Sequence, residues 1–205
     1  LFHSDTVQTI GKFRMDMEML DMDFAVGSAH KFYGPKGVGF MVVRSREKIN
    51  AFVKGGGQER KMRGGTENVY GIAGMARALQ IAQDRMDADL RHVEKLRAAF
   101  IGEIVRVLPG VAFNGSHHKQ SLPHIVNIAL PEGVDKEMLL PRLDMAGFCV
   151  STGSACASGS NRGSHVLRAL GVSEDAATLR ISFGRSNTKT QVEALVNALA
   201  NLYTN

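Results

Sequence analysis

The sequence predicts an α/β fold for its first part and a smaller α+β domain after it. Two short apolar segments rich in β-forming residues come first, and a long segment with apolar residues spaced three and four apart follows. Strand and helix patterns then alternate up to the C-terminus. A chain of 205 residues is long enough to bury the core of one large or two small domains.

The first elements are strands followed by a long helical region. Residues 1–5 have the pattern of a strand end, and residues 24–27 and 38–43 are apolar runs bounded by glycine, proline or charge. From residue 69 to 104 the spacing predicts an amphipathic helical region, either continuous or broken once. Pro109-Gly110 ends this region.

The second part alternates between strands and helices. The patterns predict strands at 124–130, 148–151 and 178–183 and helices at 136–146 and 190–203. We place the domain boundary near residue 87, inside or beside the long helical region. The predicted domains are therefore residues 1–87 and 88–205.

Composition and charge exclude several classes of protein. The net charge is +5, but basic residues are spread along the chain, and the one local cluster (Lys54, Arg60, Lys61 and Arg63) is typical of a solvated face. Direct nucleic-acid binding is therefore not expected. No apolar run approaches the roughly 20 residues that cross a bilayer, so no membrane span is expected either.

The chain has two cysteines, Cys149 and Cys156, too few for a zinc site and too far apart for a CxxC motif. Free thiols in a reducing compartment are the better interpretation. Cys149 lies between Phe148 and Val150, so we expect a buried structural thiol there.

Polar residues follow two of the predicted strands. Ser28-Ala29-His30-Lys31 stands where the 24–27 strand ends, and ligands of α/β sheets collect at the carboxyl ends of strands. Taken alone, this His-Lys pair is more often a surface feature that enters a turn. The glycines that follow do not match GxGxxG and precede a strand, which excludes a Rossmann fingerprint.

Asp5 and Gln8 also follow a predicted strand. A carboxylate there could hold a protonated ring nitrogen and an amide could reach a neighbouring oxygen, as a pyridinium cofactor requires. Helix capping is the simpler role for Asp5. Thr66 precedes the long helical region, where its hydroxyl could cap the helix or join free backbone N–H groups in an anion site.

Residues 151–164 are nearly all Ser, Gly and Ala, with Cys156 in their middle. Such a segment is expected to be mobile and its cysteine exposed, either as a nucleophile or sulfur carrier or as an incidental surface thiol. Arg185 follows a strand and a glycine. Its planar guanidinium could clamp a carboxylate or form a structural ion pair.

Five motifs, taken together and in order, resemble the NifS/IscS type of cysteine desulfurase: Ser-x-His-Lys at 28–31, the Gly-Pro-Lys-Gly-x-Gly turn, Gly-Gly-Gly-Gln-Glu-Arg, Gly-Thr-Glu-Asn, and Ser-x-Gly-Ser-Ala-Cys. This group belongs to the class-V aminotransferase family of pyridoxal-phosphate enzymes, with the aspartate-aminotransferase-like fold (fold type I). The resemblance implies that residues 1–87 are the C-terminal part of the large cofactor-binding domain. Residues 88–205 would be the small α+β domain with a mobile cysteine loop.

The resemblance also implies a role for each candidate residue. Lys31 would carry pyridoxal 5′-phosphate covalently, and Cys156 would form a persulfide on a mobile loop. Asp5 would pair with the ring nitrogen, and Gln8 would contact the phenolic oxygen. Ser28 and His30 would hold the phosphate, together with Thr66 from across a homodimer interface. Arg185 would bind the substrate carboxylate.

The implied reaction converts L-cysteine to L-alanine in the cytoplasm and passes sulfur to a sulfur-acceptor or iron–sulfur scaffold protein. A selenocysteine lyase is a close alternative. A non-catalytic sulfur-carrier or assembly subunit is another, with Cys156 as a persulfide or transient iron–sulfur ligand, but such a carrier would not need Asp5, Gln8 and Lys31. Family members carry a further N-terminal half, which we expect in cis or as a separate chain.

Overall fold

The computed structural model describes residues 1–44, 49–115, 121–152 and 164–203. The chain forms two compact units, Leu1–Ala88 and Asp89–Asn205, which are described separately. Their division falls inside helix α1 (Val69–Val107).

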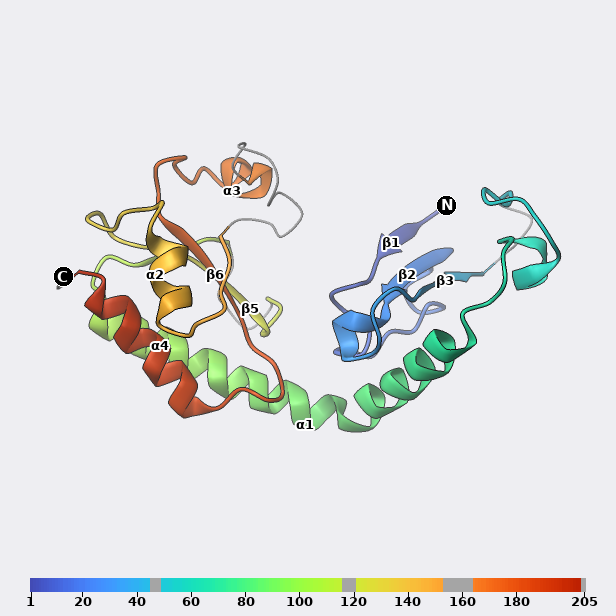
Figure 1. Ribbon diagram of the computed structural model, residues 1–205, viewed down its shortest axis with the longest axis horizontal. Coiled ribbons are helices and arrows are strands. Elements are labelled where there is room, and N and C mark those ends of the chain that lie inside the picture. The colour runs from blue at the N-terminus through green and yellow to red at the C-terminus, as the bar shows by residue number, and fades with distance from the viewer. Residues whose placement is uncertain (45–48, 116–120, 153–163, 204–205) are drawn as a thin grey trace. The chain divides into compact units, whose positions relative to one another are not determined.

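The first unit contains a sheet of three strands, β1 (His3–Asp5), β2 (Phe24–Ser28) and β3 (Gly39–Val43), in the order β1-β2-β3 (Figure 1). β1 runs parallel to β2, whereas β3 is antiparallel to it. The predicted strands are confirmed. Since β1 and β2 are parallel, their carboxyl ends lie at the same edge of the sheet, which brings Asp5 and Ser28 to that edge.

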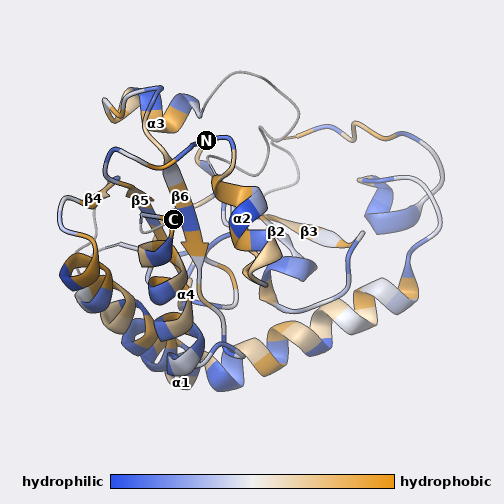
Figure 2. Ribbon diagram, turned by 60° about the vertical axis from the view of Figure 1, so that its left-hand side comes forward, coloured by the Kyte–Doolittle hydropathy of each residue, from blue (hydrophilic) through white to orange (hydrophobic). Residues whose placement is uncertain are grey.

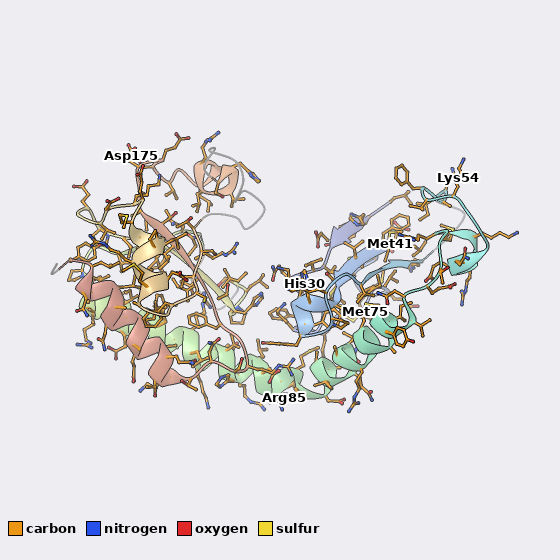
Figure 3. All side chains as sticks on the ribbon, viewed as in Figure 1. His30, Met41, Lys54, Met75, Arg85 and Asp175 are labelled. Carbon is orange, nitrogen blue, oxygen red and sulfur yellow. The ribbon has the colours of Figure 1, made fainter. Side chains whose placement is uncertain are left out.

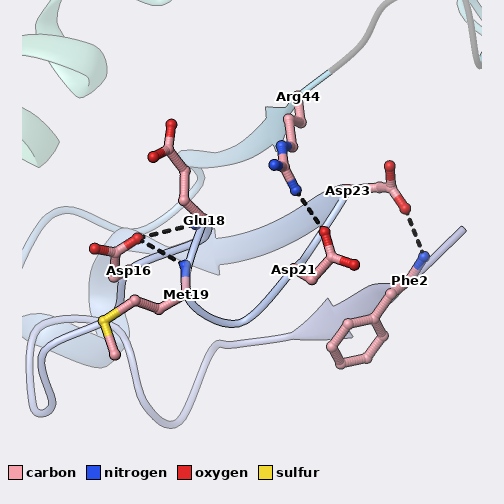
Figure 4. Close-up of polar contacts among 7 residues, drawn as sticks. All are labelled: Phe2, Asp16, Glu18, Met19, Asp21, Asp23 and Arg44. Atoms are coloured by element: carbon pink, nitrogen blue, oxygen red, sulfur yellow. Dashed lines mark hydrogen bonds and ion pairs between the residues drawn. The ribbon is translucent and has the colours of Figure 1, made fainter.

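Polar contacts fasten the opposite end of this sheet (Figure 4). The backbone N–H of Phe2 donates to Asp23 Oδ2 at 2.8 Å, which ties the start of β1 to the start of β2. Arg44, just after β3, donates to Asp21 Oδ1 at 2.9 Å. In the loop before β2, Asp16 Oδ1 accepts two backbone N–H bonds. The contacts of Asp21 and Asp23 therefore lie at the end of the sheet away from Asp5 and Ser28.

The core of the first unit is small. Ala29, Phe32 and Ala82 form one buried cluster, on which Phe40 of β3 and Met75 of α1 pack as partly buried side chains (Figure 3 labels Met75). The other buried apolar residues of this unit are Met22, Phe24, Ala25 and Met86. Several large apolar side chains of this unit are exposed: Leu1, Phe2, Met19, Leu20, Tyr33, Met41, Val42, Phe52, Val53, Val69, Tyr70 and Ile72.

The long helical region is one continuous helix, α1, of 39 residues. Asn68 caps its start, because Asn68 Oδ1 accepts the backbone N–H of Gly71 at 3.1 Å. The helix mixes polar and apolar residues along its whole length (Figure 2). No helix in the described part of the chain is both long enough and apolar enough to cross a membrane.

The second unit packs helices on an antiparallel sheet of β4 (Ala112–Phe113), β5 (Ile125–Ala129) and β6 (Thr178–Ser182). Alternate strand residues, such as Ile128 and Leu179, enter its core. The core also takes buried residues from the later part of α1, from α2 (Leu139–Met145) and from α4 (Lys189–Asn201). A short helix, α3 (His165–Ala169), precedes β6. The mixed α/β architecture agrees with the predicted fold class.

Two predicted elements differ from the structure. The helix predicted at 136–146 begins only at Leu139, because Asp135 Oδ1 accepts the N–H groups of Glu137 and Met138 in a turn before it. The strand predicted at 148–151 is absent from the described residues, where Ser151 alone pairs in an isolated bridge with Arg180.

The expectation of a buried Cys149 is wrong, since this thiol is exposed. Phe148 and Val150 on either side of it pack against the core of the second unit. In extended chain, alternate side chains point to opposite faces. Two inward-pointing neighbours therefore direct Cys149 outward.

Candidate cofactor and substrate site

The turn after β1 presents Asp5 at the sheet edge. Thr6, the next residue, is buried, and its hydroxyl donates to the carbonyl of Val26 on β2 at 2.6 Å. Asp5 Oδ1 accepts the N–H of Val7 at 2.9 Å, which forms an Asx turn and not a helix cap. Asp5 itself is exposed at the surface of this unit and Gln8 is half-buried in the same turn.

A single turn of 3-10 helix, η1 (Ala29–Phe32), directly continues β2. Its first and last residues are buried in the core, so the two between them, His30 and Lys31, face outward (Figure 3 labels His30). The N–H of Gly34 donates to the carbonyl of Ala29 at 2.8 Å and closes the turn. Asp5, Ser28, His30 and Lys31 thus occupy one edge of the first unit.

The segment after Asp5 folds back onto η1. Ile10 packs against the core of the first unit, and Gly11, with φ +72°, has no room for a side chain because a Cβ would lie 2.8 Å from Phe32 Cβ. Lys12 Nζ donates to the backbone oxygen of Lys31 at 3.1 Å. Burial, and secondly the charge of Lys31, lowers the pKa of Lys12 from 10.5 to about 8. Sequence reasoning missed Lys12, since no local pattern links it to Lys31.

Thr66 is exposed and precedes α1. Because Asn68 caps this helix, the capping alternative for Thr66 is wrong. The four basic residues of the local cluster, Lys54, Arg60, Lys61 and Arg63, are all exposed (Figure 3 labels Lys54).

Arg185 of the second unit lies next to an acidic residue. Its Nε is 3.6 Å from Asp89 Oδ2 on α1. The same loop makes a second contact with α1, in which His92 Nε2 lies 2.9 Å from the carbonyl oxygen of Asn187. The structure therefore places Arg185 in an ion pair that fastens the loop after β6 to α1.

Arg180 is a candidate that sequence reasoning missed, because it stands in the middle of a strand. Its neighbours Leu179 and Ile181 enter the core, so its side chain lies on the other face of the sheet. Its Nε is buried and has no hydrogen-bond partner in the described part of the chain. Unpaired buried donors are uncommon, and a carboxylate is the natural partner of a guanidinium.

Arg180 also pairs with Ser151, the first residue of the 151–164 segment whose sequence contains Cys156. Its backbone N–H donates to the carbonyl of Ser151 at 2.6 Å, and the N–H of Ser151 donates back at 3.3 Å. Opposite Arg180 on β5 is Asn127, whose Oδ1 accepts from Asn114 Nδ2 at 2.7 Å. Cys156 lies outside the described residues.

Comparison with known proteins identifies the class of protein. The family model described as aminotransferase class-V matches residues 1–195. The chain belongs to this family. It is similar over 97% of its length to a cysteine desulfurase IscS of Clostridium botulinum (strain Hall), at 40% identity, and over 95% to a cysteine desulfurase of Rattus norvegicus, at 38%.

Within the family the chain is of the IscS/NifS-like cysteine desulfurase type. A solved structure of a NifS-like protein superposes on the whole chain with a TM-score of 0.86 and 36% identity. This chain covers 50% of the Clostridium relative, 43% of the rat relative and 52% of the NifS-like structure. It thus spans about half the length of the relatives it matches.

The family depends on pyridoxal phosphate, and the groups gathered in the first unit suit that cofactor. A carboxylate (Asp5), a hydroxyl (Ser28) and an amine (Lys31) lie along one sheet edge, beside an imidazole and an amide. These groups match a protonated ring nitrogen, a phosphate, an aldehyde and a phenolic oxygen. Among the described residues, no group of three or more His, Cys, Asp or Glu side chains could hold a metal ion.

Proposed function

We propose that this chain is the C-terminal half of a cysteine desulfurase, which converts L-cysteine to L-alanine and transfers the sulfur to Cys156. The observation that carries the proposal is the convergence of Asp5, Ser28 and Lys31 on one sheet edge in an IscS/NifS-like chain. The persulfide would serve iron–sulfur cluster assembly or another sulfur-transfer pathway in the cytoplasm.

The residues of the first unit would divide the work around the cofactor. Bound pyridoxal phosphate would supply an electron sink for the charge that develops at the substrate α-carbon. The Asp5 carboxylate would keep the ring nitrogen protonated, and the Gln8 amide would contact the phenolic oxygen. The Ser28 hydroxyl and the His30 imidazole would hold the phosphate. The Lys31 amine would bind the cofactor and, when neutral and released by substrate, move protons at the α-carbon.

The sulfur step would be carried by Cys156. Its thiolate attacks the substrate sulfur, the carbon–sulfur bond breaks, and its electron pair stays with the carbon skeleton. A proton completes the methyl group, so L-cysteine and a thiol give L-alanine and a persulfide. No external oxidant or reductant is needed.

Two arginines are candidates for the substrate carboxylate. Arg185 is the residue that the resemblance implies, but it would have to leave Asp89. Arg180 has a buried Nε that no described residue engages, and it lies next to Ser151. We therefore propose Arg180 as the carboxylate-binding residue, with Arg185 holding the loop.

The enzyme would act as a homodimer, with Thr66 reaching the phosphate of the partner's site. Two apolar residues near Thr66 support an interface there, because Phe52 and Tyr70 are 97% and 92% exposed. The first unit would also receive the other half of the protein, in cis or as a separate chain. Both outer strands of its sheet, β1 and β3, lack a further neighbour among the described residues.

The first experiment asks whether Lys31 binds the cofactor. The purified chain is incubated with pyridoxal phosphate and reduced with borohydride, and the labelled peptides are mapped by mass spectrometry. We expect yellow absorbance and labelling at Lys31, both lost in Lys31→Ala and retained in the matched variant Lys36→Ala, which removes an exposed lysine. Equal labelling of the Lys31→Ala protein at another lysine would refute the assignment.

The second experiment asks what the chain needs for turnover. We expect no alanine or sulfide from the 205 residues alone, and turnover once the N-terminal half of the Clostridium relative is joined to them. We call this fusion the completed enzyme. Turnover by the chain alone would contradict the half-protein proposal. Faster turnover of selenocysteine than of cysteine would favour a lyase, and failure of both chains to bind the cofactor would favour a sulfur carrier.

A further inference from the structure

Three consecutive residues in the segment after β1 contact η1, the turn that presents Lys31. Ile10 packs on the core that contains Ala29 and Phe32. Gly11 approaches Phe32 so closely that a Cβ would lie 2.8 Å away. Lys12 Nζ then donates to the Lys31 carbonyl at 3.1 Å. The packing of Ile10 and Gly11 therefore positions Lys12 against η1.

The contact between Lys12 and Lys31 brings two positively charged side chains close together. Lys12 is half-buried, and Lys31 on η1 is the like charge that acts on it. On α1, which packs against Gly11 through Ala82, the nearby charged residues Asp84, Arg85 and Asp87 are exposed. Asp87 pairs at 3.4 Å with Arg14, which belongs to the same segment as Lys12.

We propose that Lys12 is a positioning residue for Lys31: its side-chain amine holds the Lys31 carbonyl and so fixes the turn that presents the Lys31 amine. The protonated amine makes the stronger hydrogen bond. A turn held in this way presents the Lys31 amine in one place for reaction with an aldehyde. The inference rests on the proposed function, in which Lys31 carries the cofactor.

The electrostatic part can be tested on the chain without any cofactor. Each lysine is titrated by competitive acetylation with light and heavy acetic anhydride between pH 6 and 11, followed by peptide mass spectrometry. We expect Lys12 to titrate near pH 8, where burial and Lys31 place its pKa. Its titration should move to higher pH in Lys31→Met and stay in Lys36→Met. Titration of Lys12 together with the exposed Lys36 would overturn the proposal.

The positioning part is read from the borohydride-trapped adduct of pyridoxal phosphate at Lys31. We expect Lys12→Met to lower the trapping rate at Lys31 by about tenfold, the effect of losing one hydrogen bond with a charged donor. Lys12→Arg, which keeps charge and donor, should restore most of the rate. Lys36→Met should leave it unchanged. Circular dichroism of Lys12→Met and of a second variant, Lys12→Gln, confirms that both remain folded.

The outcomes separate this inference from the proposed function. If the wild-type chain and the completed enzyme both show no preference for Lys31, the proposed function fails. If the wild type labels Lys31 and Lys12→Met labels it equally fast at every pH, Lys12 has no positioning role although the function stands. A change in the rate of Lys31 labelling near pH 8, where Lys12 titrates, supports the inference if it is lost in Lys12→Met, because a merely structural lysine would not produce it.

Discussion

Nε of Arg185 lies 3.6 Å from the carboxylate of Asp89, and both side chains are largely buried, at 21% and 23% exposure. Arg180, on the strand just before, has a buried Nε with no partner in the described part of the chain. Both Nε atoms are therefore buried, and the two arginines differ in the ion pair: Arg185 faces the Asp89 carboxylate, whereas no described residue pairs with Nε of Arg180. The Arg180 donor suits an incoming anion.

Arg180 and Arg185 should therefore respond differently to mutation. In the completed enzyme we expect Arg180→Met to weaken cysteine binding by roughly ten- to a hundredfold, since a hydrogen bond to a charged group is lost. Arg185→Met should instead lower the free energy of unfolding by about 1–3 kcal/mol, because the largely buried Asp89 carboxylate loses this cation. Substrate titrations and urea denaturation measure the two effects. The reverse pattern would establish Arg185 as the carboxylate ligand.

The two cysteines should differ in both accessibility and function. Since Cys149 is exposed, we expect it to react rapidly with a thiol reagent in the native Cys156→Ala chain. In the completed enzyme, Cys156→Ala should bind cofactor but form no persulfide, whereas Cys149→Ala should transfer sulfur normally. Mass spectrometry of the intact protein detects the added sulfur. Sulfur transfer in the absence of Cys156 would rule out this residue as the acceptor.

Asp5→Asn separates the charge of Asp5 from its structural role. The asparagine oxygen can still accept the N–H of Val7, which lies 2.9 Å from Asp5 Oδ1. We expect the stability of the chain to change by less than about 0.5 kcal/mol, the usual range for a surface substitution. Turnover by the completed enzyme should fall strongly, because the neutral amide cannot hold the ring nitrogen in its protonated state. Undiminished turnover would remove Asp5 from the cofactor site.

Lys12 should make the stability of the chain depend on pH. Its pKa is lowered from 10.5 to about 8 in the folded state, so between these values the unfolded chain binds more protons than the folded chain. The contribution of Lys12 to the free energy of unfolding should therefore rise as the pH increases from about 8 to 10.5, and it should be absent below pH 8. Urea midpoints of the wild type and Lys12→Met across this range give the difference. A constant difference would contradict the lowered pKa.

Two glycines should respond oppositely to alanine. Gly11 has φ +72° and its added Cβ would lie 2.8 Å from Phe32 Cβ, so Gly11→Ala should cost about 1–3 kcal/mol of stability. Gly102, inside α1, has open space around an added Cβ. Gly102→Ala should therefore stabilise by roughly 0.5–1 kcal/mol through helix propensity. Thermal denaturation compares the two, and loosening of η1 in Gly11→Ala should also slow adduct formation at Lys31.

Much of the site was predictable because its residues stand next to the elements that place them. The strands β1 and β2 follow from local apolar patterns, and their ends carry Asp5 and Ser28 directly. Lys31 lies within one turn of the end of β2. The continuous α1 was one of two alternatives that periodicity allowed, and packing along its apolar positions favours the unbroken form.

Other features depended on contacts that no local pattern encodes. Cys149 was expected to be buried because its neighbours are apolar, but those neighbours take the inward positions. Arg180 escaped notice because a strand residue reveals its face only after the sheet has formed. Its Nε matters because the fold buries it and, among residues 1–44, 49–115, 121–152 and 164–203, none pairs with it.

The sequence by itself determined the family type, the order of the strands and helices, and the identity of the residues proposed for cofactor and sulfur chemistry, since these reside in short contiguous motifs. Only the tertiary structure decided that Asp89 pairs with Arg185, that no described residue pairs with Nε of Arg180, and that Lys12 donates to the Lys31 carbonyl from 19 residues away. The physical reason is that hydrogen bonds and ion pairs depend on distance in space. That distance is set when packing brings remote segments together.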